Sequence, residues 1–256
     1  MPWIALTRAV SPTLARCELT HLARSPIDPA RAEAQHARYE ATLRELGCTV
    51  QRVTPAPELP DAVFIEDTAI VLDELAMITR PGAESRRAEV AAVAEALAPY
   101  RALHRIEAPG TIDGGDVMQV GRTFFVGRTA RTNDDGIAQL RAAVAPHGYR
   151  VTPVTVTACL HLKSAATALG DDAVLCNPAW VDPALFAPYV VVHVAADEPH
   201  AANVVSLGTH VLAAEAYPAT NARLRAHGYD VVTVPADELA KAEGALTCCS
   251  LLVRVG

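Results

Sequence analysis

The stretch DGGDVMQV (113–120) begins with small and polar residues and continues as an apolar strand pattern. The same design recurs at starts that lie 39 to 49 residues apart, in FIEDTAIV (64–71), HLKSAATA (161–168), HAANVVSL (200–207) and LTCCSLLV (246–253). Most of these stretches are followed by a turn and a second strand pattern. Five units with a period in the forties indicate a closed or stacked repeat architecture rather than an open sheet.

A second repeat links helix patterns to strand patterns. It appears in LRELGCTVQRVTPA (43–56), VAPHGYRVTPVTV (144–156) and LRAHGYDVVTVPA (224–236). Each stretch joins the end of an Ala-, Leu- or Arg-containing helix pattern to a β-branched strand through a glycine, where we expect a left-handed C-cap. The two repeats together predict an α/β fold of five ββαβ units, a propeller-like ring in which the polar starts meet at one central pocket.

Composition excludes several classes of protein. The 256 residues are 51% hydrophobic, which suffices for a full core, and we expect a single domain over residues 1–256. With 22 basic and 29 acidic residues, a net charge of -7 and no Lys/Arg block, binding to nucleic acid or to a membrane is not expected. The start has no signal-peptide pattern, so we expect a cytoplasmic protein whose six cysteines are reduced thiols.

The register of the repeats distinguishes the two adjacent cysteines of LTCCSLLV. Side chains alternate along a strand, so the first and third positions of each unit share one face. One face then carries Asp113, His161, Glu66 and Cys248, and the other carries Asp67, Asp116, Ser164, Asn203 and Cys249. This pattern predicts that Cys248, and not Cys249, faces the pocket.

A cysteine, a histidine and a carboxylate from three units form the set that thiol nucleophilic catalysis uses. Each residue also has a purely structural interpretation. Cys248 can be a small buried residue, His161 a hydrogen-bonded core histidine and Asp113 a turn residue before two glycines. The sequence has no closely spaced metal-ligand pair, so we expect no metal site.

Several motifs together resemble those of the dimethylarginine dimethylaminohydrolases, a family of the guanidino-group-modifying (pentein) superfamily. The matching stretches are FIEDTAIV (64–71), ITRPGAESRRAEV (78–90), APGTIDGGDVMQVGRTFFVGRTARTN (108–133), HLKS (161–164), AAN (201–203) and GALTCCS (244–250). The resemblance extends from Leu19 to Cys249. It implies a five-bladed α/β propeller, in agreement with the repeat spacing.

The resemblance also implies a role for individual residues. Cys248 matches the nucleophile, His161 the general acid and base, and Asp113 the acidic residue beside that histidine. The substrate-binding positions are matched by Asp67 for the guanidinium, Asp61 and Glu66 for the α-amino end, Arg86 and Arg131 for the α-carboxylate, and Leu19 on a loop that closes over the substrate.

The activity that this resemblance implies is hydrolysis of N-omega-methylated arginines to citrulline, without a metal or an organic cofactor. One alternative is a deiminase that acts on arginine itself. The deiminase branches typically have H-x-D at the histidine motif, whereas this chain has Lys163 at the third position. The other alternative is a pentein that binds a ligand without chemistry. A homodimer is compatible with either class.

Overall fold

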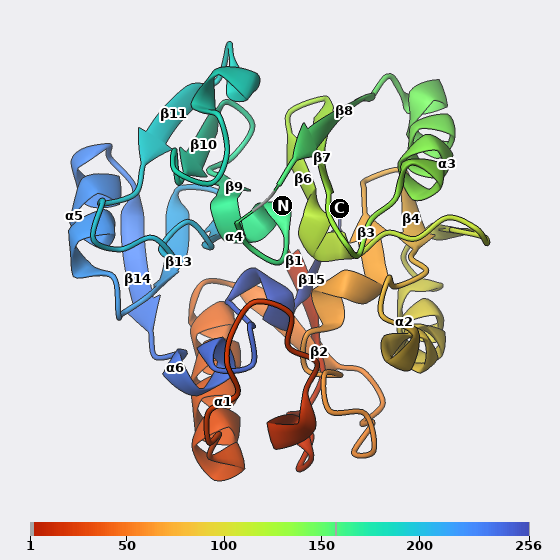
Figure 1. Ribbon diagram of the computed structural model, residues 1–256, viewed down its shortest axis with the longest axis horizontal. Helices are drawn as coiled ribbons and strands as arrows, with labels where there is room; N and C mark the ends of the chain where they lie inside the picture. Colours follow the sequence, from red (N-terminus) through yellow and green to blue (C-terminus); the bar gives the residue numbers. More distant parts are fainter. Residues whose placement is uncertain (1–2, 157, 256) are drawn as a thin grey trace.

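The computed structural model describes residues 3–156 and 158–255. Within them are five three-stranded sheets that share one design. In each sheet an inner strand pairs antiparallel with a middle strand, and the middle strand pairs parallel with an outer strand. The sheets surround a central axis, and α1, α2, α3 and α5 lie on the outside (Figure 1). The predicted fivefold α/β propeller is confirmed.

The sheets follow one another along the chain. The second sheet contains β3 (Ala69–Val71), β4 (Leu75–Ile78), α2 (Val90–Leu97) and β5 (Ala102–Arg105). The third contains β6 (Val117–Val120), β7 (Thr123–Arg128), α3 (Asp134–Val144) and β8 (Arg150–Thr155). The fourth contains β9 (Ala166–Ala168), β10 (Ala173–Cys176), β11 (Val190–His193) and the short 3-10 turn η6 (Pro183–Phe186). The fifth contains β12 (Val205–Leu207), β13 (His210–Ala214), α5 (Pro218–Ala226) and β14 (Asp230–Val234).

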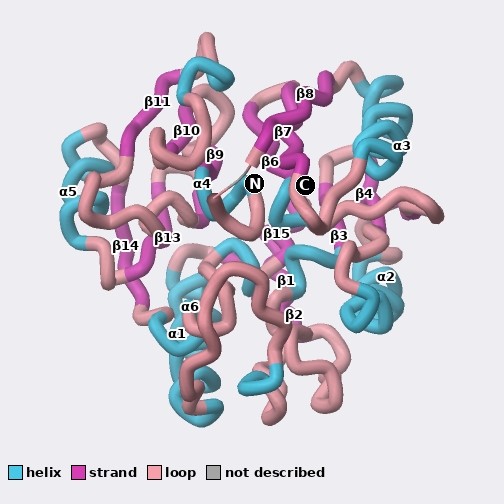
Figure 2. The backbone as a smooth tube through the Cα atoms, in the orientation of Figure 1, coloured by secondary structure: helices cyan, strands magenta, loops and turns pink. Residues whose placement is uncertain are grey.

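The first sheet closes the ring because it combines both ends of the chain. Its inner strand is β15 (Leu251–Arg254), which pairs antiparallel with β1 (Trp3–Thr7); α1 (Pro29–Glu45) and β2 (Cys48–Arg52) complete the sheet. Figure 2 shows both ends of the described chain near the centre of the molecule. Backbone hydrogen bonds between β15 and β1 therefore hold the last and the first strand of the chain together in one blade. A single domain remains our prediction.

The three glycines expected at helix C-caps have the predicted conformation. Gly47, Gly148 and Gly228 have φ values of 88°, 78° and 91°. An added Cβ would meet no atom within 4 Å at any of them. The left-handed backbone, and not a lack of space, therefore favours glycine at these positions.

The starts of the repeats differ from the prediction. Residues expected in strands lie instead in single helical turns before the inner strands: η2 (Ile65–Thr68), η4 (Gly114–Asp116), α4 (Leu162–Ala165) and η7 (Thr247–Cys249). Strict two-face alternation is therefore wrong for these residues, because a 3-10 turn rotates successive side chains by about 120° rather than 180°. The start at His200 also differs, since His200 is exposed and packs edge-to-face against Trp180.

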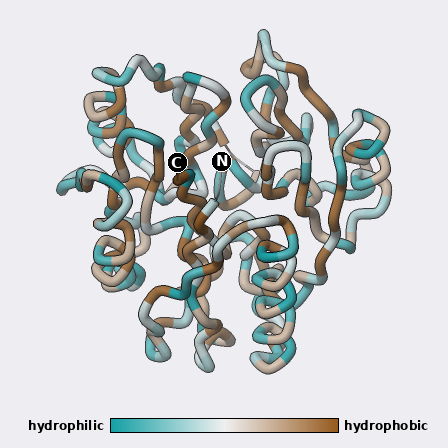
Figure 3. Tube along the Cα trace, turned by 180° about the vertical axis from the view of Figure 1, so that it is seen from behind, coloured by the Kyte–Doolittle hydropathy of each residue, from teal (hydrophilic) through white to brown (hydrophobic). Residues whose placement is uncertain are grey.

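The core lies between neighbouring blades and beneath the outer helices. Five buried apolar clusters fill it, and one of them contains both Cys248 and Cys249. Figure 3 shows hydrophobic stretches along the central strands and more hydrophilic stretches on the outer turns and loops. None of the described helices is long and apolar enough to cross a membrane.

Candidate active site

A narrow cavity brings together most of the residues singled out in the sequence. Its lining includes the thiol of Cys248, the imidazole of His161 and four further predicted residues, Asp61, Asp67, Arg86 and Arg131. The other lining residues are Glu18, Phe64, Leu160, Ala242, Glu243 and Gly244. Thiol, imidazole, carboxylates and guanidinium groups therefore share one small enclosed space.

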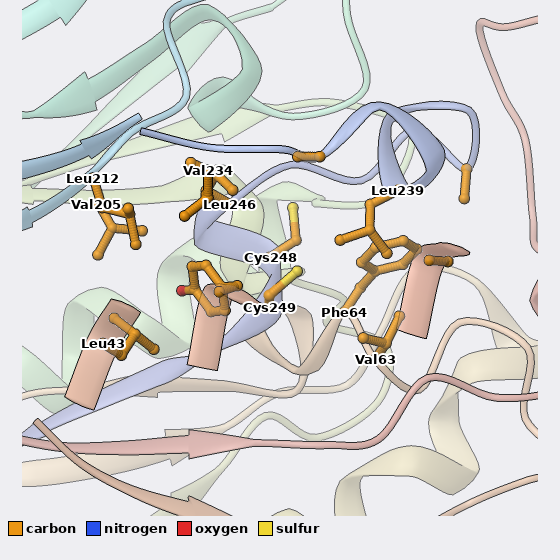
Figure 4. Packing of buried hydrophobic residues seen from close by; sticks show 14 of the residues in the cluster. Leu43, Val63, Phe64, Val205, Leu212, Val234, Leu239, Leu246, Cys248 and Cys249 are labelled. Atoms are coloured by element: carbon orange, nitrogen blue, oxygen red, sulfur yellow. The ribbon is translucent and has the colours of Figure 1, made fainter. Parts of the chain in front are cut away.

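The two adjacent cysteines have different surroundings. Both lie in η7, next to Phe64 and Leu246 (Figure 4). Cys248 lines the cavity, whereas Cys249 has no exposed surface and its thiol donates to the carbonyl oxygen of Ala245 (3.4 Å). Burial, together with the charges of Glu66 and Asp67, raises the pKa of Cys248 well above its usual value. Without a bound cation, Cys248 is therefore a thiol.

His161 lies between two carboxylates. Its Nε2 is 3.3 Å from Oδ2 of Asp113, and its Nδ1 is 3.8 Å from Oδ1 of Asp67. Burial by itself lowers the pKa of His161, but the charges of Asp67 and Asp116 and the hydrogen bond with Asp113 raise it to about 9. The ring is therefore an imidazolium at neutral pH and is ready to donate a proton.

The D-G-G-D segment builds one wall around this imidazole. Asp113 is fully buried, and its Oδ1 accepts the backbone N–H of Gly82 (2.9 Å). Gly115 donates its N–H to Oδ1 of Asp67 (2.9 Å), and a Cβ on Gly115 would lie 2.5 Å from Nδ1 of His161. Glycine at this position thus leaves the space that the imidazole occupies.

Arg86 organises the opposite wall through a buried charge network. Its guanidinium binds Oδ2 of Asp67 through Nη1 and both carboxylate oxygens of Glu89 through Nε and Nη2 (3.0 and 2.8 Å). Nη2 also donates to the carbonyl oxygen of Phe64 (2.8 Å). Burial by itself raises the pKa of Asp67, but the charges of His161 and Arg86 and the N–H of Gly115 lower it to about 2. Asp67 is therefore an anion at all physiological pH values.

The segment around Leu19 covers the mouth of the cavity. Asp61 accepts the backbone N–H of Glu18 (3.1 Å), and Arg131 donates to the hydroxyl of Thr20 (3.2 Å). The carboxylate of Glu243 accepts the N–H groups of Thr20, His21 and Leu22. Leu19 itself is partly buried and does not line the cavity. These contacts hold the segment in a closed position.

Glu66, predicted to bind the substrate, lines a different cavity. It accepts hydrogen bonds from Nζ of Lys163 (2.6 Å) and from the hydroxyl of Thr247 (2.7 Å). These three residues line a second cavity, of about 390 Å³, between the inner strands of the blades. That cavity is the larger of the two, but among the described residues only the narrow cavity brings the thiol of Cys248 and the imidazole of His161 together with carboxylates and arginines.

Some residues of the site were missed in the sequence. Glu89 lies three residues after Arg86, and this i,i+3 spacing was an available signal for an ion pair on a helical turn. Asp116 lies in the D-G-G-D segment, but the strand interpretation placed it away from the pocket. Glu243 gave no signal, since its partners are more than 200 residues away in the chain.

Comparison with known proteins gave close relatives over almost the whole chain. No model of a protein family matches it. The N(G),N(G)-dimethylarginine dimethylaminohydrolase of Streptomyces coelicolor is 44% identical over 253 residues, which are 98% of this chain and 96% of the relative. A cysteine-to-serine mutant of the Pseudomonas aeruginosa enzyme in complex with citrulline has a TM-score of 0.93 and 32% identity, with 97% and 98% of the two chains covered. A histidine-to-glycine mutant of a dimethylarginine dimethylaminohydrolase, solved as an adduct with S-methyl-L-thiocitrulline, has a TM-score of 0.92 with the same identity and coverage.

Proposed function

This chain belongs to the family of the N(G),N(G)-dimethylarginine dimethylaminohydrolases, and on that premise we propose that it hydrolyses N-omega-methylated arginines to citrulline and a methylamine. The observation that carries the proposal is the narrow cavity in which Cys248 and His161 face Asp67 and the arginines. A planar cation fits beside Asp67, and an amino acid head group fits the charges at the mouth.

The substrate is held at both ends in this scheme. Asp67 binds the guanidinium, while Arg131 exchanges the hydroxyl of Thr20 for the substrate α-carboxylate. Asp61 faces the α-amino group. Arg86 is already bound to Asp67 and Glu89, so its main effect is to keep Asp67 charged and in place. The segment 18–22 opens for entry and closes over the bound substrate.

The first chemical step uses the charge of the substrate. A guanidinium next to Cys248 stabilises the thiolate, and the thiol proton passes to solvent, because His161 is already protonated. The sulfur attacks the guanidinium carbon and forms a tetrahedral adduct. His161 gives its proton to the departing dimethylamine as the carbon–nitrogen bond breaks, which leaves a thiouronium bound to Cys248.

The second step returns the enzyme to its starting state. Neutral His161 takes a proton from water, and the hydroxide attacks the same carbon. The carbon–sulfur bond then breaks, the proton of the added hydroxyl passes to the departing thiolate of Cys248, and citrulline is released. The free dimethylamine takes up the proton that the thiol gave to solvent in the first step. His161 is again an imidazolium between Asp67 and Asp113. The scheme needs no metal or organic cofactor, and this remains a prediction.

Lys163 favours methylated arginine over arginine as the substrate. A deiminase with H-x-D would place a second carboxylate at this position. Here Lys163 is bound to Glu66 and to the carbonyl oxygen of Gly114 and lines the other cavity. Asp67 is then the carboxylate that grips the guanidinium from one side, which suits a nitrogen whose hydrogens are replaced by methyl groups.

A citrulline assay with dimethylarginine, monomethylarginine and arginine tests the proposal. We expect turnover of the methylated substrates by the natural protein and by Cys249→Ser, and a loss of at least about 1000-fold for Cys248→Ser. Arginine as the best substrate would favour the deiminase, and no turnover of any substrate would favour a binding protein. Gel filtration of the same samples tests whether the protein is a homodimer.

A further inference from the structure

The second aspartate of the D-G-G-D segment has no role in the scheme above. We propose that Asp116 is a positioning residue that fixes His161 in place and keeps its ring protonated for proton transfer to the leaving amine. This inference rests on the proposed function. Asp116 does not line the narrow cavity, so it acts on His161 through the backbone and through its charge.

Asp116 binds the backbone directly beside His161. Its Oδ1 accepts the N–H of Leu162 at 3.0 Å, and this bond joins the third blade to α4 of the fourth. His161 is the N-cap of α4, and its side chain caps no N–H group of that turn. The Asp116 carboxylate therefore anchors the turn at the residue that follows the imidazole.

The other carboxylate oxygen holds two threonine hydroxyls. Thr129 and Thr132 lie 2.6 and 2.7 Å from Oδ2 of Asp116. Each hydroxyl also accepts a backbone N–H, from Arg131 at Thr129 and from Asp113 at Thr132 (both 3.1 Å). A hydroxyl that accepts from an amide has its single hydrogen free for Asp116. All three side-chain contacts thus donate to this carboxylate, which is the pattern of an ionised acid.

The neighbouring strand leaves space for this carboxylate. Gly127 lies in β7, and a Cβ built on it would lie 2.6 Å from Oδ1 of Asp116 and 3.1 Å from Cβ of Leu162. Any larger residue would push the carboxylate away from the N–H of Leu162. The glycine of F-F-V-G-R therefore belongs to the same arrangement as the D-G-G-D segment.

The charge of Asp116 has no arginine or lysine partner among the described ion pairs. The side chain is fully buried, and burial raises its pKa to about 6 although His161 opposes that shift. A buried anion without such a partner favours the charged form of the nearest titratable cation, and Asp116 is among the groups that raise the pKa of His161. Other charged and titratable groups surround Asp116 and His161. They are Asp67 from η2, Arg86 from η3 (Glu84–Glu89), Asp113 and Arg131 from the third blade, Cys159 from the loop before α4, and Cys248 from η7.

The test compares Asp116→Asn with the natural protein in two measurements. NMR of ring-labelled histidines, with His161→Gln to identify the signal, gives the pKa of His161 in the free protein. We expect that pKa to fall by at least about one pH unit, because a neutral amide no longer stabilises the imidazolium. In the citrulline assay, the pH above which kcat falls should decrease by a similar amount. At its optimum, kcat should fall by about 100-fold, while KM stays within about threefold of the natural value.

Two further variants separate positioning from folding. Asp135→Asn makes the same substitution at an exposed position of α3 and should match the natural protein in both measurements. Gly127→Ala keeps the charge but displaces the carboxylate, so kcat should fall by about tenfold with little change of KM. If Asp116→Asn does not fold, Gly127→Ala decides the question.

The proposal is overturned if folded Asp116→Asn leaves the pKa of His161 and the kcat profile unchanged, or if Gly127→Ala has the kcat of the natural protein. A protein that converts none of the substrates contradicts the proposed function instead. In that case the pKa of His161 still shows whether Asp116 controls its protonation.

Discussion

Arg86 and Asp67 form an ion pair in the wall of the narrow cavity, and both side chains are almost completely buried. Removing the guanidinium leaves two buried carboxylates, Asp67 and Glu89, without their cation. We expect Arg86→Leu to lower the free energy of unfolding by about 3–5 kcal/mol, measured by urea denaturation. Arg87→Leu is the control, because Arg87 forms an ion pair with the exposed Glu84 and donates to the carbonyl oxygen of Pro81, and its loss should cost less than about 1 kcal/mol. Equal losses in both variants would contradict the network.

Cys248 should react slowly with iodoacetamide at neutral pH, because its pKa is raised. The rate should increase as the pH rises, and Cys248→Ser should abolish the labelling that inactivates the protein. Glu66→Gln removes one of the charges that raise this pKa, so its labelling at a given pH should be faster by about threefold or more. Cys249→Ser, whose position has no exposed surface, is the control and should keep the natural rate. Slower labelling of Glu66→Gln would refute this account.

The raised pKa of His161 predicts how its contribution to stability depends on pH. A histidine whose folded-state pKa is raised from 6.5 to about 9 contributes fully below pH 6.5, and the contribution is lost as the pH rises through about 9. The difference in unfolding free energy between the natural protein and His161→Gln should therefore shrink across this range. Denaturation at several pH values measures it, with His147→Gln at an exposed turn as the control. A difference that grows with pH would show that His161 is neutral in the folded protein.

The contacts of Glu243 keep the segment 20–22 closed over the mouth of the narrow cavity. Its carboxylate holds three successive N–H groups of residues 20–22, which Glu243→Ala releases. Hydrogen exchange of these amides should become faster, and KM for dimethylarginine should rise by about tenfold, because the substrate must then order the segment itself. Glu84→Ala, another surface glutamate near the site, is the control. Unchanged exchange at residues 20–22 would mean that other contacts hold the segment.

Much of the fold could be predicted because it repeats. The five apolar strand patterns and the three glycine C-caps depend on local backbone preferences. Such preferences can be recognised in each stretch of sequence separately. The two-face assignment failed for a local reason. It placed Glu66 with Cys248 and Asp67 on the other face, whereas the 3-10 turn η2 puts Asp67 in the cavity and Glu66 against Lys163.

The sequence by itself therefore determined the α/β ring, the family and the motif that contains the nucleophile we propose. Only the tertiary structure decided which charges meet. Arg86 with Asp67, Asp116 with the backbone of Leu162, and Glu243 with the segment 20–22 are contacts between different parts of the ring. Their partners depend on the rotation of short turns and on the space that glycines leave, and neither quantity is visible in the spacing of residues along the chain.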